Sequence, residues 1–401
     1  MAKNETKGNV VDISSNTQML KLYNKKGRAR RIVCLVLSII LLLGGAGSLY
    51  YYKLLDSLNF VADDEKKVQS ATTAQNVSSG DVIGDSELLQ DSKVLNVMLF
   101  GEDNNHGDKY GRTDTMILLS IDNTHKKLKL TSFQRDTYVY IPGHGYNKIN
   151  ASYTLGGAKL SIETIEANFG VKIDRYAIVD FQSFIDIIDT LNGIDMEVTQ
   201  DEIDYINYQM YKNGQVKGRT TITDPPGIVH LNGQEALWYA RNRGLTKGED
   251  GNEIGLSGDD WDRTSRQRKL LETMVNRFKT ADLGQIISIV NQVGPMVTTN
   301  LKKDEITALV ANSLTYLNYK VVQNYIPKEG LWYYNSPDDE SWDIAGSCIC
   351  IADMTAQRKA FADFIYETGV SSDVEATVDK NAKQTTTESG GTSAESNSSE
   401  Q

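Results

Sequence analysis

An uncharged run over residues 32–52, IVCLVLSIILLLGGAGSLYYY, constrains this chain more than any other feature. A helix rises about 1.5 Å per residue, so about 20 apolar residues cross the hydrocarbon core of a bilayer. The flank before the run is basic, with cationic side chains at Lys21, Lys25, Lys26, Arg28, Arg30 and Arg31. Since cytoplasmic flanks carry the excess of Lys and Arg, the pattern predicts a cytoplasmic tail over 1–31 and a transmembrane helix over 32–52.

A cleaved signal peptide is the other interpretation of this pattern. The long basic flank and the long apolar run favour a retained anchor, and no clear small-residue cleavage site follows the run. We therefore expect a single-pass protein of the cell membrane. Its N-terminus lies in the cytoplasm and the rest of the chain lies outside the cell.

The charge is distributed unevenly about this anchor. The chain has 42 basic and 53 acidic side chains, a net charge of −11. Residues 1–52 contribute eight basic and two acidic groups, or +6, so the remainder carries −11 − 6 = −17. Such an acidic domain lacks the basic face that nucleic-acid binding needs. Any site for an anion must be built locally, and three cysteines are too few for a disulfide scaffold.

Composition also divides the chain into segments. Residues 53–92 have mixed helical and polar character and predict an extracellular stalk. A folded domain with a C-terminal helical extension is expected over 93–370. Residues 371–401 are Ser, Thr, Glu and Gly with almost nothing apolar, which predicts a disordered tail.

The hydrophobic periodicity of the central segment predicts alternating strands and helices. Strands are expected at Val94–Phe100, Thr115–Asp122, Lys127–Phe133, Ile173–Val179 and Ile194–Val198. Helices are expected before Gly170, before Gly193, and at Arg263–Lys279, Leu283–Val293 and Asp304–Leu317, the last with Asp304 as its N-cap. This order predicts an α/β layered domain with a mixed central sheet flanked by helices.

One strand carries a distinct pattern. Lys127, Lys129 and Thr131 alternate with apolar or small residues, as in a strand with one face in solvent. The sequence therefore predicts that this strand is half-exposed.

Arginine is concentrated in one part of the chain. Five of the fourteen arginines fall within 28 residues, at Arg241, Arg243, Arg263, Arg266 and Arg268. Arg241 and Arg243 share a face if that stretch is extended, whereas Arg263, Arg266 and Gln267 share one face at the start of a helix. Guanidinium forks at a helix N-terminus suit a phosphate. A solvated face of arginines paired with nearby carboxylates is the alternative.

Two aspartates form a second candidate site. Asp103 follows a predicted strand and Asp114 precedes one, with Arg112 beside it and Arg135 at the end of the third strand. Carboxylates at strand ends next to arginines favour Mg²⁺ together with phosphate. Aspartates in an ordinary loop are the alternative.

Five blocks in this order resemble one family. They are GRTDT (111–115), LTSFQRDTYVYIPG (130–143), YNKINASYTLGG (146–157), LNGQEALWYARNR (231–243) and DWDRTSRQR (260–268). Together they resemble the LytR–CpsA–Psr family of membrane-anchored cell-wall ligases from Gram-positive bacteria. The resemblance extends over about residues 94–279.

The resemblance implies a reaction and a set of residues. Members of the family transfer a glycopolymer, such as teichoic acid or capsule, from a polyprenyl-pyrophosphate carrier to peptidoglycan. The matching positions imply Mg²⁺ bound by Asp103 and Asp114. Pyrophosphate-binding residues are implied at Arg112, Arg135, Arg241, Arg243, Arg263, Arg266 and Gln267. Candidate catalytic residues are Asp260, Arg112 and Arg243, with Asp260 as a candidate base.

The chemistry agrees with this resemblance. No cytoplasmic ATP is available outside the membrane, so a donor there must carry its own high-energy bond, as a lipid-linked pyrophosphate does. Hydrolysis of the same pyrophosphate, with water as acceptor, is a second hypothesis. A non-catalytic wall-binding regulator is a third, and a DNA-binding regulator is the weakest.

Three further patterns each have two interpretations. The apolar helix faces within 181–191 and 270–293 line either a lipid slot or an ordinary core. The aromatic residues within 331–342 form either a glycan-stacking surface or ordinary core or rim packing. Cys348 and Cys350 are expected to be free thiols because a disulfide across so short a loop is strained.

Overall fold

The computed structural model describes residues 59–61, 88–103, 110–213, 221–242, 246–247, 253–254, 260–279, 282–335 and 347–367. The predicted transmembrane segment over 32–52, the basic tail before it and the tail over 371–401 lie outside these residues. Within the described ranges, no helix is both long enough and apolar enough to cross a membrane.

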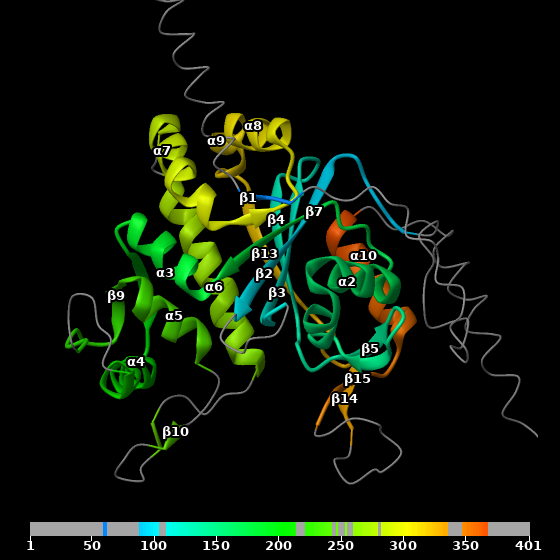
Figure 1. Cartoon of the computed structure of the whole chain (residues 1–401), viewed down its shortest axis with the longest axis horizontal. Coiled ribbons are helices and arrows are strands. Elements are labelled where there is room, and N and C mark those ends of the chain that lie inside the picture. Colours follow the sequence, from blue (N-terminus) through cyan, green and yellow to red (C-terminus); the bar gives the residue numbers. More distant parts are fainter. Residues whose placement is uncertain are drawn as a thin grey trace, which may run out of the picture. The chain divides into compact units, whose positions relative to one another are not determined.

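A mixed seven-stranded sheet organises the folded unit (Figure 1). Its strands are β1 (Asn59–Phe60), β2 (Val94–Asp103), β3 (Arg112–Asp122), β4 (Lys127–Phe133), β7 (Arg175–Asp180), β12 (Thr298–Thr299) and β13 (Lys320–Ile326). They lie in the order β1-β12-β7-β2-β3-β4-β13. The strand β2 runs parallel to β7 and antiparallel to β3, and β4 runs parallel to β13. The predicted mixed sheet is thus confirmed.

Helices cover both faces of this sheet (Figure 1). One face is covered by α2 (Ala151–Phe169) and α10 (Met354–Tyr366). The elements on the other side are α3 (Phe181–Thr190), α5 (Gly233–Arg241), α6 (Asp260–Phe278) and α7 (Leu283–Val293). Gly170 ends α2 in the left-handed conformation, as the sequence predicts.

Short elements extend this framework. They are β5 (Tyr138–Ile141) with β6 (Gly145–Lys148), β8 (Ile194–Val198) with β9 (Gly227–Leu231), β10 (Thr246–Lys247) with β11 (Glu253–Ile254), β14 (Trp332–Tyr334) with β15 (Ile349–Ile351), α4 (Gln200–Asn213) and a 3-10 turn over Gly294–Met296. Cys348 and Cys350 are free, as expected, with their Sγ atoms 3.9 Å apart.

Two short parts of the range predicted as a stalk belong to the folded unit. Asn59 and Phe60 pair with β12, and Leu89 forms a bridge with Val171 and packs against the main core. The core between the sheet and the helices α2 and α10 includes the rings of Phe133, Phe169 and Phe361. The folded unit therefore includes residues that precede Val94.

The helix expected over 304–317 is divided. The structure has α8 (Lys303–Ala311) and α9 (Ser313–Tyr316), with the break at Asn312. There the side chains of Asn312 and Ser313 donate hydrogen bonds to the carbonyls of Ala308 and Val310, which compete with a continuous helix.

The expected N-cap of that helix was also wrong. Lys302, and not Asp304, is the N-cap, because its backbone is still extended, with φ −70° and ψ 155°. The carboxylate of Glu305 accepts a hydrogen bond from the Lys302 N–H at 2.8 Å. The prediction of a mostly helical second half missed β13, which is an edge strand of the sheet.

The prediction of a half-exposed strand β4 was wrong. Lys129 and Thr131 are buried, because α10 packs over the end of the sheet. The Lys129 Nζ lies 2.7 Å from Asp122 Oδ2 and 3.0 Å from Glu367 Oε1. Burial alone would raise the pKa of Asp122, but the hydrogen bonds from Lys129 and His125 outweigh it and lower that pKa. A buried ion pair thus joins the β3–β4 hairpin to the end of α10.

Loss of the Lys129 ammonium should therefore destabilise the fold. We expect Lys129→Met to lower the free energy of unfolding by about 3 kcal/mol, because it leaves the Asp122 carboxylate buried without its cation. The matched change Lys127→Met removes a partly exposed lysine of the same strand and should cost under about 1 kcal/mol. Urea unfolding of the full-length chain measures both.

The pH dependence gives a second readout for the same pair of variants. Because the pKa of Asp122 is lowered in the folded state, the ionised carboxylate stabilises the fold at pH values above its unfolded pKa. This stabilisation is lost as the pH falls through the pKa of the folded state. The loss of unfolding free energy caused by Lys129→Met should therefore become smaller at acidic pH. Equal losses for the two variants at neutral pH would contradict the buried ion pair.

Candidate active site

A β-bulge in the β2–β3 hairpin sets the direction of Asp114. Gly101 pairs with Thr115 and Glu102 pairs with Thr113, so Asp114 is the extra residue of β3 in this register. A bulge bends its strand and redirects the inserted side chain. A Cβ atom at Gly101 would lie 2.9 Å from Thr115 Cβ, so this close approach requires glycine.

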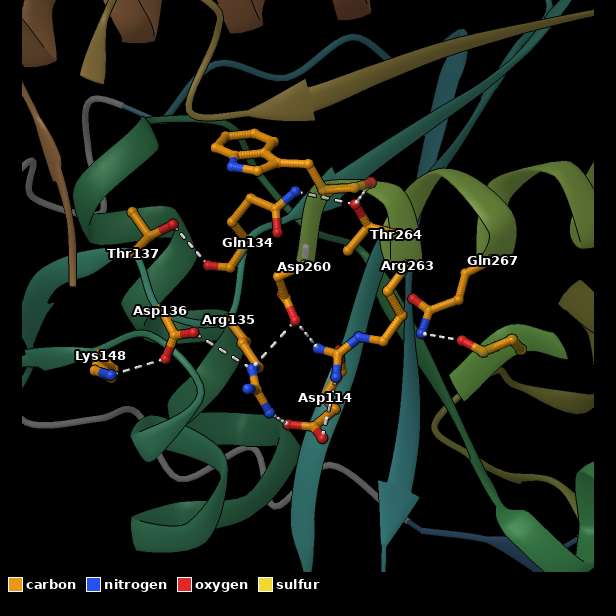
Figure 2. Close-up of polar contacts among 12 residues, drawn as sticks. Asp114, Gln134, Arg135, Asp136, Thr137, Lys148, Asp260, Arg263, Thr264 and Gln267 are labelled. Atoms are coloured by element: carbon orange, nitrogen blue, oxygen red, sulfur yellow. Dashed lines mark hydrogen bonds and ion pairs between the residues drawn. The ribbon is translucent and has the colours of Figure 1, made fainter. Parts of the chain in front are cut away.

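Four charged side chains meet beside this bulge and form what we call the charged cluster: Asp114, Arg135, Asp260 and Arg263 (Figure 2). Arg135 Nη1 donates to Asp114 Oδ1 at 2.8 Å, and Arg263 Nη1 lies 3.5 Å from Asp114 Oδ2. Arg263 Nη2 lies 2.6 Å from Asp260 Oδ1, and Arg135 Nε lies 3.4 Å from the same oxygen. Guanidinium and carboxylate groups therefore alternate around a ring.

Three elements distant in sequence supply the charged cluster. Arg135 follows β4, and Asp114 lies in β3. Asp260 and Arg263 are three residues apart in the first turn of α6, so they lie on one face of that helix. The N-terminus of a helix carries free N–H groups and a partial positive charge. The position thus adds to the positive potential of the two guanidinium groups.

The charged cluster is buried at one end and open at the other. The exposed fraction of the side chain is 4% for Arg263 and 16% for Asp260, but it is 20% for Arg135 and 43% for Asp114. A ligand can therefore approach from the side of Asp114 and Arg135. At the closed end, low solvent access strengthens each electrostatic interaction.

Burial shifts the pKa of Asp260 upward. Desolvation is the largest cause, and the charges of Arg263 and Arg135 oppose it without cancelling it. For Arg135, burial would lower the pKa, but Asp114 and Asp260 outweigh it and raise the pKa. The charged cluster thus combines a permanent cation with a carboxyl group that takes up a proton more readily than an exposed aspartate.

A second layer holds Arg135 in place, and the sequence analysis missed it. Gln134 Nε2 donates to Thr264 Oγ1 of α6 at 2.9 Å. Asp136 lies 3.4 Å from Arg135 Nε and 2.9 Å from Lys148 Nζ of β6 (Figure 2). Asp136 and Lys148 fall within the motif blocks at 130–143 and 146–157, and their charge next to Arg135 is a signal that could have singled them out.

The two predicted metal ligands lie at the same end of the sheet. Asp103 is the last residue of β2 and pairs in register with Arg112, the exposed first residue of β3. Glu102 accepts a hydrogen bond from the Gly111 N–H at 3.3 Å. The oxygen ligands of Asp103 and Asp114 are the type that a hard divalent cation prefers.

Among the described residues, one set of three side chains of the metal-binding types lies close enough to hold an ion, namely Asp122, His125 and Glu367. There the Lys129 ammonium already bridges the two carboxylates, which argues against a metal ion at that place.

The remaining predicted residues separate into different environments. Arg241 is the last residue of α5 and not part of an extended stretch, and its guanidinium lies 4.4 Å from the centre of the Phe181 ring. Arg266 turns toward the carbonyl of Asn242 and lies 4.0 Å from Glu202, on the side of α4. No contact described in the structure joins Arg266 to the charged cluster. Arg243 lies outside the described residues.

An apolar cavity of about 190 Å³ lies next to the charged cluster. It is lined by residues of β2, β3, β7, α3, α5 and α6. Gly101 and Thr115, which flank the bulge, are among them, and Arg241 and Gln267 add polar atoms. Leu270, Leu271 and Met274 continue the lining along α6. The helix faces that the sequence offered for a lipid slot therefore enclose part of a real cavity.

The geometry can be compared with known proteins. The chain is 29% identical over 320 residues to the polyisoprenyl-teichoic acid–peptidoglycan teichoic acid transferase TagV of Bacillus subtilis strain 168, covering 77% of this chain and 75% of that protein. It is 30% identical over 271 residues to the polyisoprenyl-teichoic acid–peptidoglycan teichoic acid transferase TagU of Oceanobacillus iheyensis, covering 64% of this chain and 75% of that protein.

Solved structures share the fold. The crystal structure of B. subtilis TagV matches with a TM-score of 0.50 and 28% identity, over 69% of this chain and 98% of that one. A structure of the LytR-CPS2A-psr family protein YwtF (TagT) with bound octaprenyl pyrophosphate lipid matches with a TM-score of 0.50 and 21% identity, over 76% and 99%. The model of the LytR_cpsA_psr family matches residues 51–344, and the chain belongs to this family.

Proposed function

We propose that this chain is a phosphotransferase that moves a glycopolymer from a polyprenyl-pyrophosphate carrier to a hydroxyl group of peptidoglycan. The observation that carries this proposal is the charged cluster next to an apolar cavity, whose lining includes Thr115, the residue after Asp114, and Gln267, one helical turn after Arg263. A ligand with a charged head and an apolar tail matches that arrangement. The names of the TagV and TagU relatives, and the lipid in the YwtF structure, support the same reaction class.

The pyrophosphate of the donor binds at Arg135 and Arg263, and Arg112 approaches from the exposed end of β3. In the closed end of the site, guanidinium groups stabilise the charge that spreads over the non-bridging oxygens during transfer. The isoprenoid tail enters the cavity that Leu270 and Met274 line. Gln267 and Arg241 lie at the boundary between tail and head. Arg243 is proposed at the same site from its motif alone.

Asp103 and Asp114 would hold the Mg²⁺ ion. When bound, the ion supplies further positive charge to the phosphate oxygens. The side chain of Asp114 already contacts Arg135 and lies near Arg263, so this carboxylate also fixes the direction of both guanidinium groups.

Asp260 is the proposed general base. The acceptor oxygen forms a bond to the sugar-linked phosphorus while the bond from that phosphorus to the bridging oxygen breaks. The hydroxyl proton passes to Asp260, and the electron pair leaves with the polyprenyl phosphate. Arg263, 2.6 Å from Asp260, keeps the carboxylate in place before it accepts the proton.

The cellular location follows from the same proposal. Residues 32–52 anchor the chain in the membrane, with the basic tail in the cytoplasm and the domain outside. This places the site next to the leaflet where the lipid carrier presents its polymer. Teichoic acid is the polymer that the names of the relatives favour.

The arginines of the charged cluster should control transfer. We expect Arg135→Ala and Arg263→Ala to lower the transfer rate by about 10²–10³ each, because each removes a cation from the developing phosphate charge. The matched control is Arg277→Ala, an exposed arginine near the other end of α6. The measurement uses the full-length chain in detergent, a lipid-linked donor and peptidoglycan, with the polymer-linked product quantified.

The same assay separates transfer from hydrolysis. Release of polyprenyl phosphate that depends on added peptidoglycan supports transfer. Equal release without any acceptor would instead identify a pyrophosphate hydrolase. Loss of activity in Arg277→Ala equal to that in Arg263→Ala would refute a specific role for the charged cluster.

Asp260 should determine the acidic limb of the pH profile. Burial raises the pKa of Asp260 above its usual 3.8, and only the deprotonated form accepts a proton, so the rate should rise as the pH rises through that raised pKa. Asp260→Asn should remove this limb and lower the rate by about 10²–10⁴. The control is Asp262→Asn, which changes an exposed aspartate in the same helical turn. It should leave both the acidic limb of the pH profile and the transfer rate unchanged. An unchanged limb in Asp260→Asn would rule out this base.

A further inference from the structure

We infer that an aromatic surface beside the charged cluster binds the sugar rings of the acceptor, a glycan strand of peptidoglycan. The surface, here called the aromatic cluster, consists of Trp261, Tyr325, Trp332 and Tyr334. This inference rests on the proposed transfer reaction and assigns the place where its second substrate binds.

The aromatic cluster is built from three elements that converge at the start of α6. The rings of Trp261 and Trp332 stack with centroids 4.9 Å apart and an interplanar angle of 28°. Tyr325 of β13 meets Trp261 edge-on at 5.3 Å, and Tyr334 meets Trp332 edge-on at 5.0 Å. The indole N–H of Trp261 donates to the Tyr334 hydroxyl at 3.3 Å. These contacts hold the rings in one arrangement before any ligand binds.

Part of the aromatic cluster faces solvent. Tyr334 is 51% exposed, and Trp261 and Trp332 are half-buried. Successive residues of a strand point to opposite faces, so Trp332 and Tyr334 share one face of β14 while Tyr333 points to the other. Tyr333 accordingly interacts with Cys350. A large exposed aromatic ring leaves apolar surface in contact with water, which is unfavourable. A ligand that packs on the ring would remove this surface from water.

Sugar rings are the ligand chemistry that fits this surface. Rigid aromatic rings provide a flat apolar contact at low entropic cost, and the Tyr and Trp polar atoms supply hydrogen bonds at the edge. A hexopyranose presents an apolar C–H face and polar hydroxyl groups at its rim, so it matches both features. Asp260 of the charged cluster and Trp261 of the aromatic cluster are consecutive residues in the first turn of α6, so the two clusters are neighbours.

The order of the elements across the sheet favours the acceptor over the donor. The apolar cavity lies over β7, β2 and β3, the charged cluster contains residues of β3 and of the segment after β4, and the aromatic cluster lies at the edge strand β13. The charged cluster is therefore between the other two. In an in-line displacement, the attacking and leaving oxygens lie on opposite sides of phosphorus. If the leaving lipid phosphate points toward the cavity, the acceptor hydroxyl arrives from the side of the aromatic cluster.

Charge supports the same choice. Glu329 lies beside the aromatic cluster, with its Oε2 3.4 Å from the Tyr325 hydroxyl. An exposed carboxylate disfavours a polymer that carries repeated phosphates, whereas an uncharged sugar backbone is indifferent to it. On the buried side of the aromatic cluster, the Arg268 guanidinium lies 5.9 Å from the centre of the Tyr325 ring. Arg268 Nε donates a hydrogen bond to Gln323, and this bond holds the guanidinium against the ring.

Adjacent tyrosines of β14 provide a matched test. Tyr334→Ala removes the exposed ring from the aromatic cluster, Tyr334→Phe keeps the ring without its hydroxyl, and Tyr333→Ala removes an equally exposed ring, at 50%, from the opposite face. The probe is an uncharged chitin fragment of β-1,4-linked N-acetylglucosamine, which presents the same pyranose C–H faces without the lactyl carboxylates of N-acetylmuramic acid. It is titrated into the full-length chain in detergent and followed by tryptophan fluorescence. The transfer assay then gives KM separately for acceptor and donor.

We expect Tyr334→Ala to weaken binding of the fragment and to raise the acceptor KM by about three- to tenfold, with the donor KM unchanged. Tyr334→Phe should recover most of the loss, and Tyr333→Ala should match the wild type. Equal acceptor KM values in Tyr334→Ala and wild type would overturn the inference, as would a rise confined to the donor KM, which would assign the surface to the glycopolymer.

The transferase function and the glycan-binding surface can be refuted separately. A wild-type chain that binds the fragment through Tyr334 but transfers nothing refutes the transferase function and leaves the glycan surface supported. A wild-type chain that transfers normally, with all three variants unchanged, refutes the glycan surface and leaves the transferase function intact.

Discussion

Arg263 is a nearly buried cation, and the site depends on how its charge is compensated. Taking a guanidinium out of water is costly unless carboxylates and hydrogen bonds replace the lost hydration. Asp260, at 2.6 Å, and Asp114, at 3.5 Å, supply that compensation from two elements. Because Asp114 belongs to the sheet and Asp260 to α6, the same charge balance positions the helix on the sheet.

That balance explains how an acidic domain builds an anion site. The part of the chain after residue 52 carries −11 − 6 = −17, so its overall field repels phosphate. Two guanidinium groups at a helix N-terminus, shielded from solvent at one end, reverse the potential locally. Under the proposed function, the cavity, the charged cluster and the aromatic cluster then form one path for tail, pyrophosphate and acceptor, in that order across the sheet.

The features that the sequence predicted correctly depend on short-range patterns. The periodicity of β2, β3 and β4 and the stop at Gly170 are local, so the strands and α2 were predictable. The motif blocks likewise contained Asp114, Arg135, Asp260 and Arg263 as candidates for one site. Lys129 shows the limit of such patterns. An alternating strand normally has a solvated face, but α10, more than 200 residues later, covers this one.

Neighbours in the chain were enough to predict the family, the alternating strands and helices, and the residue types available for phosphate binding. Which of the candidate residues meet depends instead on how distant segments pack. Arg263 and Asp260 turn toward Asp114, whereas Arg266 on the same helix turns toward Glu202. The same packing makes Trp261 and Trp332, 71 residues apart in sequence, stack beside the site. Side-chain direction depends on helix rotation, bulges and packing, and only the folded chain sets these.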